Sequence, residues 1–178
     1  MFDGVGRRRD KSSKQLVNIG AHSLNGNERN CLFRNNGDGG FTDVGYVNGA
    51  DRKEDGRGLS IMDYDVDGRP DVMLRNYKQP AQLLHNVGVG GHWLEIKLIG
   101  TKSNRDAVGA RITVRSGDLS QLREVHAGSG YLSGSSLVQH FGLGDRTRVD
   151  SVEIRWPSGI TTRAEDLTAD RLVTVRED

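Results

Sequence analysis

The sequence has only one cysteine, Cys31, among its 178 residues. An intrachain disulfide and a cysteine-ligated zinc site each need at least two cysteines, so neither can form within this chain. The stretch "CLFRN" reads as strand, and we expect Cys31 to be a buried or half-buried thiol. No apolar run approaches the ~18 residues of a membrane-spanning helix, and the N-terminal residues lack the apolar stretch of a signal peptide.

Excess charge, proline and aromatic residues are also scarce. The 25 basic and 24 acidic residues give a net charge of +1, which argues against a charge-driven role on nucleic acid or a membrane surface. Proline occurs 3 times, and aromatic residues make up 6% of the chain. Glycine, with 24 residues, is about twice its average usage of ~7%. This combination indicates many tight turns in a thin β-architecture rather than disorder.

Two stretches repeat each other. "LFRNNGDGG" (residues 32–40) aligns with "LLHNVGVGG" (residues 83–91), with matching Leu, Asn and Gly positions and an offset of 51 residues. This offset lies in the range of propeller blades and other repeat units. Each copy is a short apolar strand that ends in an Asn/Gly turn, and the segments 16–21 and 71–76 are the expected preceding strands.

The pattern changes after Gly91 to strict alternation of apolar and polar residues. Such alternation predicts half-buried antiparallel strands, and their spacing predicts a sandwich; the segments are 92–99, 110–115, 149–156 and 171–177. The window 162–170 is the only helix-like one, and we expect one turn there. We place a boundary near residues 88–91, which gives a partial repeat region at 1–90 and a sandwich domain at 91–178.

The stretch "DYDVDGRPDV" (residues 63–72) has the oxygen ligands and the spacing of a calcium loop. Gly68 at the sixth position permits the sharp turn around an ion. Without an ion, two carboxylates ~4 Å apart repel by about 4 kcal/mol at an effective dielectric of 20. The predicted Ca²⁺ ligands are the side chains of Asp63, Asp65, Asp67 and Asp71, with the backbone carbonyl of Arg69.

The loop differs from an EF-hand, because position 12 is Leu74 rather than Glu and both flanks are strand-like. We therefore expect a calcium loop that stabilises the connection between two strands and has no open coordination position for chemistry. An Asp-rich turn without metal is the alternative interpretation.

Other constellations favour structural interpretations. The stretch 127–136 with His126 and Ser129 invites a serine-hydrolase hypothesis, but the G-x-S-x-G spacing is absent, so a glycine-rich strand connection is favoured. The polar stretch around Asn104 is either a turn or a ligand-binding loop. Trp156 is expected to fill the core, and the five histidines do not pair at metal-binding spacing.

These motifs resemble two known families. Residues 58–76 together with 32–44 resemble the FG-GAP/VCBS-type repeat of calcium-loop β-propellers. The second half resembles the ASPIC/UnbV domain in the stretches "SNRDAVGARI", "REVHAGSGYLS", "HFGLG" and "VEIRWPSG". The resemblance covers the chain from about residue 15 and implies a secreted, calcium-binding β-propeller with a C-terminal β-sandwich and no established enzyme activity.

We therefore expect an all-β fold, in which partial FG-GAP/VCBS-type propeller blades precede a C-terminal antiparallel β-sandwich. The expected function is a non-catalytic, calcium-binding extracellular binding or adhesion module, the C-terminal part of a larger propeller protein, since a propeller needs about four to eight blades. Its expected partners are an extracellular protein or glycan, the remaining blades, or a second copy at an open blade edge. A secreted hydrolase of polysaccharide or ester, using Ser129 and His126, and a truncated structural fragment without independent function are the alternatives.

Overall fold

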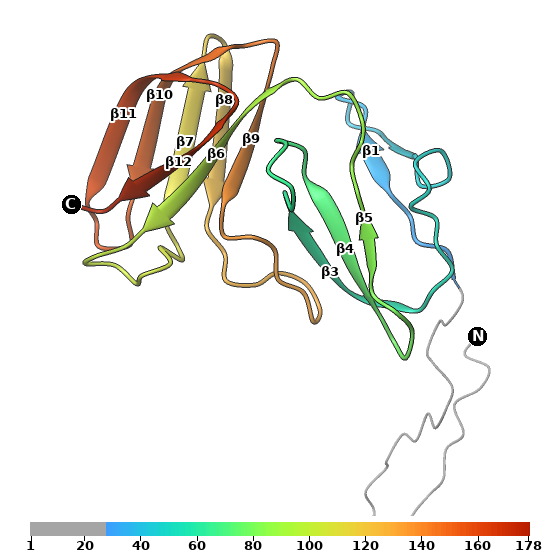
Figure 1. Cartoon of the computed structure of the whole chain (residues 1–178). Coiled ribbons are helices and arrows are strands. Elements are labelled where there is room, and N and C mark those ends of the chain that lie inside the picture. Colours follow the sequence, from blue (N-terminus) through green and yellow to red (C-terminus); the bar gives the residue numbers. More distant parts are fainter. Residues whose placement is uncertain (1–27) are drawn as a thin grey trace, which may run out of the picture. The chain divides into compact units, whose positions relative to one another are not determined.

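The computed structural model describes residues 28–178, and every regular element in this part of the chain is a β-strand (Figure 1). The all-β prediction is therefore confirmed, while the strand expected at residues 16–21 lies outside the described residues. The strands are β1 (Phe33–Asn35), β2 (Phe41–Asp43), β3 (Gly56–Met62), β4 (Asp71–Asn76), β5 (Gln82–Leu84), β6 (His92–Ile99), β7 (Arg111–Ser116), β8 (Leu119–Glu124), β9 (Gln139–Gly144), β10 (Arg148–Arg155), β11 (Thr161–Thr168) and β12 (Arg171–Arg176).

The described residues divide into two compact units. One contains residues 28–57 and 75–82, and the other contains residues 58–74 and 83–178. The aspartate loop therefore belongs to the same unit as the sandwich strands. The predicted division at residues 1–90 and 91–178 follows the repeat pattern instead, and it stays a prediction.

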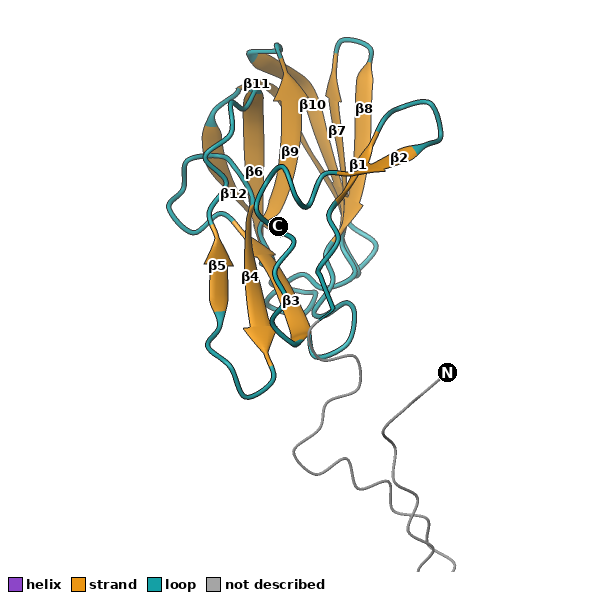
Figure 2. Ribbon diagram, turned by 90° about the vertical axis from the view of Figure 1, so that its right-hand side faces the viewer, coloured by secondary structure: helices purple, strands orange, loops and turns teal. Residues whose placement is uncertain are grey.

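The second unit contains two sheets with one shared hydrophobic core. The four-stranded sheet has the order β11-β10-β7-β8, and the three-stranded sheet has the order β12-β6-β9 (Figures 1 and 2). Alternate residues of each strand point inward, as the period-2 pattern predicts. The buried core includes Leu94, Ile96, Ile112, Val114, Phe141, Leu143, Val152 and Ile154.

One strand pair differs from the antiparallel arrangement that the sequence predicts throughout the sandwich. β12 pairs with β6 in parallel, with Arg171 opposite Leu94 and Arg176 opposite Ile99. The chain reaches β12 by crossing from β11, which lies in the other sheet. A crossing between sheets permits a parallel pair, whereas a hairpin within one sheet would make the pair antiparallel.

The predicted helical turn at residues 162–170 is wrong, because this segment forms most of β11. Ala164 and Leu167 lie opposite Val152 and Val149 of β10, so tertiary pairing overrides the helix propensity of the central residues. Trp156, which follows β10, is 2% exposed and its Nε1 donates to Thr162 Oγ1 at 2.8 Å. The prediction of Trp156 as a core residue is confirmed.

The strands of the first half form small sheets. β1 and β2 are antiparallel, with Phe33 opposite Asp43, and every residue of both strands is exposed. The prediction that Cys31 is buried is wrong, because a two-stranded hairpin exposed on both faces provides no core for a neighbouring thiol. The segment 71–76 forms β4 as predicted, in a sheet of order β3-β4-β5.

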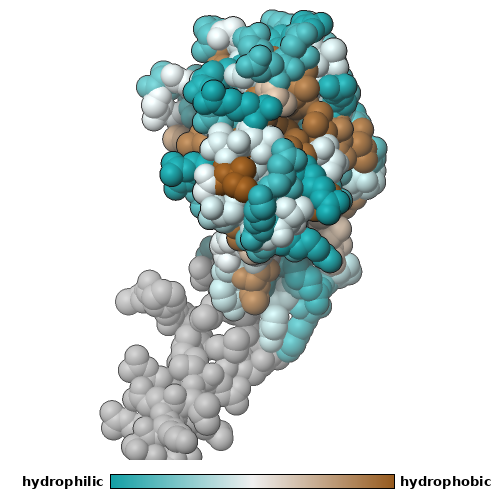
Figure 3. All heavy atoms as spheres, turned by 90° about the vertical axis from the view of Figure 1, so that its left-hand side faces the viewer, coloured by the Kyte–Doolittle hydropathy of each residue, from teal (hydrophilic) through white to brown (hydrophobic). Residues whose placement is uncertain are grey.

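The outer side of the sandwich that faces the viewer in Figure 3 mixes hydrophilic side chains with smaller hydrophobic areas. On the outer four-stranded sheet, Arg163 of β11 pairs with Glu153 of β10 at 2.8 Å. Arg148 pairs with Asp166 across the same two strands. Among the described residues there is no helix long and apolar enough to cross a membrane.

Candidate metal site

The aspartate loop connects β3 to β4 and is wound tightly by its own hydrogen bonds. The Asp63 carboxylate accepts from Asp67 N at 3.1 Å and from Gly68 N at 2.7 Å. Val66 and Gly68 have positive φ angles of 60° and 83°. A positive φ is unfavourable for a β-branched residue such as Val66, so the winding of the loop overrides its local preference.

Asp71 holds the end of the loop. It is fully buried, at 0% exposure, and its carboxylate accepts from Tyr64 N at 3.2 Å and from Asn86 N at 2.7 Å. These two donors come from the start of the loop and from the chain after β5. A buried carboxylate needs such donors or a cation, and Asp71 therefore joins three segments around one charged group.

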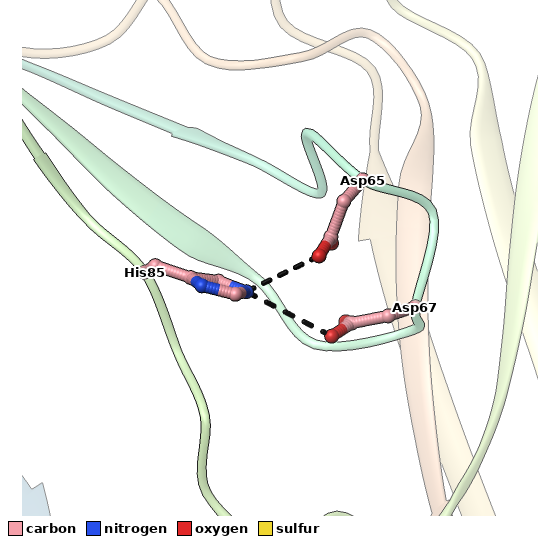
Figure 4. A group of neighbouring side chains, drawn as sticks. All are labelled: Asp65, Asp67 and His85. Atoms are coloured by element: carbon pink, nitrogen blue, oxygen red, sulfur yellow. Dashed lines mark ion pairs between the residues drawn. The ribbon is translucent and has the colours of Figure 1, made fainter.

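The folded loop brings the predicted ligands together in two overlapping groups. Carboxylate oxygens of Asp63, Asp65 and Asp71 lie within 4.8 Å of one another. Ligand atoms of Asp65, Asp67 and His85 also lie within 4.8 Å of one another. Figure 4 shows these three side chains pointing toward one another. The first group offers only oxygen ligands, which suit Ca²⁺, and Asp65 belongs to both groups. The donor set therefore fits the predicted ion.

His85 is the residue that sequence reasoning missed. It follows β5, and its Nε2 lies 3.2 Å from Asp65 Oδ2 and 4.0 Å from Asp67 Oδ2 (Figure 4). Its ring also makes an edge-to-face contact with Tyr64, with the ring centroids 5.2 Å apart. In the internal repeat His85 aligns with Arg34, so the sequence shows only a basic residue after a strand. The pairing of β5 beside β4 brings it to the loop.

Arg69 is predicted to act through its carbonyl, and its side chain has a separate role. The guanidinium pairs with the Asp67 carboxylate, and Nε donates to Asn86 O at 2.9 Å. Arg69 N also donates to Asp67 Oδ1 at 2.8 Å. Arg69 and His85 thus place positive or donor groups against the crowded carboxylates, while the carbonyl ligand stays a prediction.

We expect the His85→Gln substitution to change metal selectivity. An imidazole nitrogen suits Zn²⁺ and other transition metals, whereas Ca²⁺ prefers oxygen. The variant should bind Ca²⁺ within about threefold of the original chain and bind Zn²⁺ at least about tenfold more weakly. Calorimetric titration of each ion measures both effects, and His126→Gln, outside the loop, is the matched control. A tenfold loss of calcium affinity in His85→Gln would contradict this assignment.

The aspartate loop packs against the β12-β6-β9 sheet, on the face that points away from the hydrophobic core. A Cβ atom placed on Gly68 would lie 1.9 Å from Nε1 of Trp93, which belongs to β6. The Gly68 carbonyl accepts a hydrogen bond from His140 Nε2, of β9, at 2.8 Å. Trp93 and His140 are stacked, with ring centroids 6.4 Å apart. Burial lowers the pKa of His140, so its ring is neutral at neutral pH with the proton on Nε2.

The glycine-rich segment 127–136 has a structural role at the edge of β3. Leu59 N donates to Ser133 Oγ at 2.9 Å, and Ile61 N donates to Ser135 Oγ at 3.2 Å. Ser136 N donates to Ile61 O at 2.9 Å. These bonds supply partners to backbone groups that an edge strand would otherwise expose. The segment therefore covers one edge of the β3-β4-β5 sheet.

The two residues of the hydrolase hypothesis, Ser129 and His126, line one cavity. In the described part of the chain no hydrogen bond joins Ser129 to His126. His126 Nδ1 lies 4.0 Å from Glu124 Oε1, beyond hydrogen-bond reach, and Glu124 pairs with Arg111 at 2.9 Å. In the polar stretch before β7, Asn104 bonds both backbone groups of Val108, at 2.8 and 2.9 Å, as the turn interpretation requires.

Comparison with known protein families matches two parts of the chain. The model of the ASPIC and UnbV family matches residues 100–178. The model of the FG-GAP-like repeat matches residues 19–74, which include the aspartate loop and the start of β4. Both matches agree with the resemblances on which the sequence-based predictions rest.

Comparison with curated proteins finds cartilage acidic protein 1 from several vertebrates. The chain is 38% identical to the Mus musculus protein over 111 residues, which is 58% of this chain and 17% of the relative. It is 37% identical to the Xenopus tropicalis protein over 129 residues, or 66% of this chain and 19% of the relative. The Homo sapiens protein is 37% identical over 111 residues, or 58% and 16%.

The chain thus spans less than a fifth of the length of these relatives. The two family matches are separated by residues 75–99, which contain β5, β6 and the end of β4. The chain is thus similar to the ASPIC and UnbV family over residues 100–178 and to the FG-GAP-like repeat over residues 19–74.

Proposed function

We propose that this chain is a non-catalytic, calcium-binding extracellular module in which Ca²⁺ stabilises the aspartate loop. The observation that carries the proposal is the group of Asp63, Asp65 and Asp71, whose carboxylate oxygens lie within 4.8 Å of one another. Asp67 would complete the set of acidic ligands from the adjoining group. Bound Ca²⁺ supplies the positive charge that offsets the repulsion among these carboxylates.

The residues around the ligands connect loop stability to the sandwich. Asp71 accepts from both Tyr64 N and Asn86 N, so ordering its carboxylate orders the chain on both sides of β4. Gly68 lies against Trp93 and accepts from His140. A loop held in shape by an ion therefore keeps its contacts with β6 and β9. Calcium binding should add to folding stability through mass action.

We expect millimolar calcium to raise the thermal unfolding midpoint, and Asp65→Ala to remove most of the rise. Asp65 belongs to both ligand groups, so its removal affects each of them. An ion present at about 100 times its dissociation constant stabilises the folded state by about 2.7 kcal/mol. Differential scanning calorimetry with calcium and with a chelator measures the shift.

The matched control is Asp106→Ala, which removes a carboxylate from an exposed turn outside the loop. This variant should keep the full calcium shift. An unchanged melting temperature of the original chain in millimolar calcium would overturn the calcium proposal. A rise that persists in Asp65→Ala would place the ion elsewhere.

The extracellular setting is supported by the relatives, whose names associate them with cartilage. The proposed partners are an extracellular protein or glycan, the remaining blades, or a second copy. Exposed apolar side chains on the small sheet favour another blade as one partner: Leu59 and Ile61 on β3, Met73 on β4, and Leu83 on β5. β3 and β5 are the two edge strands of this sheet. The edge at β3 is covered by residues 133–136, which leaves the edge at β5 for a partner.

The alternatives are separated from this proposal by simple measurements. A secreted hydrolase would turn over a polysaccharide or ester, and Ser129→Ala and His126→Ala would each abolish the turnover. A structural fragment without independent function would self-associate through exposed blade surfaces, and light scattering would find oligomers. A monodisperse, calcium-stabilised monomer without turnover supports the binding module.

A further inference from the structure

A polar cavity lies between the aspartate loop and the sandwich, within the second compact unit. Its volume is about 380 Å³, at the lower end of the range for small-ligand sites. Its lining comes from the end of β3, from β6, β8 and β9, and from the glycine-rich segment 127–136. The residues that decide its chemistry are Asp63, Glu95, Arg123, Glu124, Ser129 and His140.

Glu95 is a buried carboxyl that lines this cavity without a partner. It lies on β6 opposite His140 of β9, on the outer face of the three-stranded sheet, while its neighbours Leu94 and Ile96 face the core. Its exposure is 6%. In the described part of the chain no hydrogen bond and no ion pair reaches its carboxyl oxygens. Buried carboxyl groups are ordinarily paired or hydrogen-bonded, so this one has unused acceptor capacity.

The other charged groups of the cavity are already engaged. Asp63 accepts from two backbone N–H groups of its own loop, and Glu124 pairs with Arg111 at 2.9 Å. The Arg123 guanidinium lies 5.5 Å from the centre of the Phe141 ring. His140 uses Nε2 to donate to Gly68 O, which leaves its Nδ1 as an acceptor. Glu95 is therefore the carboxyl of the lining that has neither a hydrogen bond nor an ion pair among the described residues, and the Arg123 guanidinium has only its ring contact.

We propose that this cavity binds a primary ammonium group, with Glu95 as the anionic partner of its nitrogen. A primary ammonium has three N–H donors and one positive charge, which match an unpaired carboxylate beside further acceptors. Glu95 is the carboxyl of the lining that is neither a predicted calcium ligand nor paired with an arginine. The ammonium can belong to a free diamine or to a lysine side chain of a partner protein.

The residues that line the cavity favour a primary ammonium over methylated ammonium ions and over sugars. Methylated ammonium ions are recognised by aromatic cages, and sugars by aromatic platforms with polar groups. Among the described residues that line the cavity there is no Phe, Tyr or Trp. A trimethylammonium group also lacks N–H donors. Recognition here therefore depends on hydrogen bonds that the ammonium N–H groups donate. Trimethylation removes these donors and keeps the positive charge.

The test is a nuclear magnetic resonance titration of the full chain with three probes. The first is 1,4-diaminobutane. The second is Nα-acetyl-lysine methylamide, in which only the side chain is charged, and the third is its Nε-trimethylated form. We expect the first two to shift the amide signals of residues 95, 129 and 140, and the trimethylated probe to bind at least about tenfold more weakly. Tighter binding of the diamine would identify a free amine as the source, and tighter binding of the lysine amide would identify a side chain.

Glu95→Gln should weaken binding of the better probe at least about tenfold, because the amide keeps the shape but loses the charge. The matched control is Glu153→Gln, on the outer face of β10, which should bind as the original chain does. Ser129→Phe is a second variant that fills the cavity from the exposed segment without changing β6, and it should also abolish binding. Circular dichroism shows that each variant is folded.

Equal binding of the trimethylated probe would overturn the proposal, because charge alone would then suffice. Unchanged affinity in folded Glu95→Gln and Ser129→Phe would overturn it as well, as would the absence of any shift at the cavity. Repeating the titration with and without calcium separates this site from the aspartate loop. Binding that survives in Asp65→Ala shows that the two sites stand independently.

Discussion

Gly68→Ala is expected to destabilise the second compact unit by about 3 kcal/mol. Two effects add at this position. The backbone has a φ angle of 83°, which disfavours any side chain, and the new Cβ atom would lie 1.9 Å from Trp93 Nε1 and 2.1 Å from its Cε2. The loop must then move away from β6 or the indole ring must turn. Denaturant unfolding followed by fluorescence measures the loss.

The same substitution should also weaken calcium binding. Gly68 N donates to Asp63 Oδ2 at 2.7 Å, so movement of residue 68 displaces a predicted ligand. Gly134→Ala is the matched control, because a Cβ atom placed on Gly134 would have no neighbouring atom within 4 Å. A surface change of this kind alters stability by no more than about 0.5 kcal/mol.

A double-mutant cycle isolates the contact between the loop and the sheet. In Trp93→Ala the ring is absent, so the added methyl group of Gly68→Ala meets no indole. The coupling free energy between the two changes should therefore exceed about 1 kcal/mol. The part of the Gly68→Ala loss that persists in the Trp93→Ala background comes from backbone strain at residue 68. Strictly additive losses, or a Gly68→Ala variant as stable as the original chain, would show that the loop does not rest on Trp93.

The sequence predicts the strands well where one face is apolar throughout. β6 has the expected bounds, because "HWLEIKLI" alternates from Leu94 to Leu98. β4 also has the expected bounds, which come from the repeat pattern rather than from alternation. β8, with the sequence "LSQLRE", escapes prediction, since its apolar residues are three positions apart and do not alternate. β11 resembles a helical turn in sequence, because Ala164, Glu165 and Leu167 favour a helix until β10 provides a partner.

The candidate site is predictable only to the extent that it is local. The four aspartates and Gly68 lie within nine residues, so their spacing alone indicates a cation loop. His85, Trp93 and His140 reach the same loop through sheet pairing, and no spacing in the sequence connects them to it. Glu95 reads as the polar face of an ordinary half-buried strand, and only the packing of the loop and segment 127–136 makes that face interior.

Glu177 also finds its partners only through tertiary structure, and we expect its substitution to cause a large loss of stability. The residue follows β12 and is 2% exposed. Its Oε2 accepts from the N–H groups of Thr101, Lys102 and Ser103 at 2.9, 2.9 and 2.7 Å. Its Oε1 accepts from the hydroxyls of Ser103 and Ser158 at 2.9 and 2.5 Å. The carboxylate thus joins the end of β12 to the turns after β6 and β10.

Burial alone would raise the pKa of Glu177, but the hydrogen bonds from Ser158, Ser103 and Thr101 outweigh it and lower the pKa from 4.5 to about 2. The unfolded chain therefore binds the proton more tightly than the folded chain. The stability contributed by this carboxylate is complete above pH 4.5 and is lost as the pH falls toward about 2.

Glu177→Gln should lower the thermal unfolding midpoint at neutral pH by about 5–10 °C. The Gln side chain has one acceptor oxygen, and its NH₂ group takes the place of the other carboxylate oxygen. An NH₂ group cannot accept a hydrogen bond, so the N–H or O–H groups that faced that oxygen lose their partner. Glu165→Gln, an exposed glutamate on β11, is the control and should leave the midpoint unchanged. The difference between the original chain and Glu177→Gln should stay constant from pH 7 to about 4.5 and narrow between pH 4.5 and about 3, because the unfolded chain then binds a proton that the folded chain does not. A difference that stays constant over this lower range as well would show that the side chain acts by shape alone and not by charge.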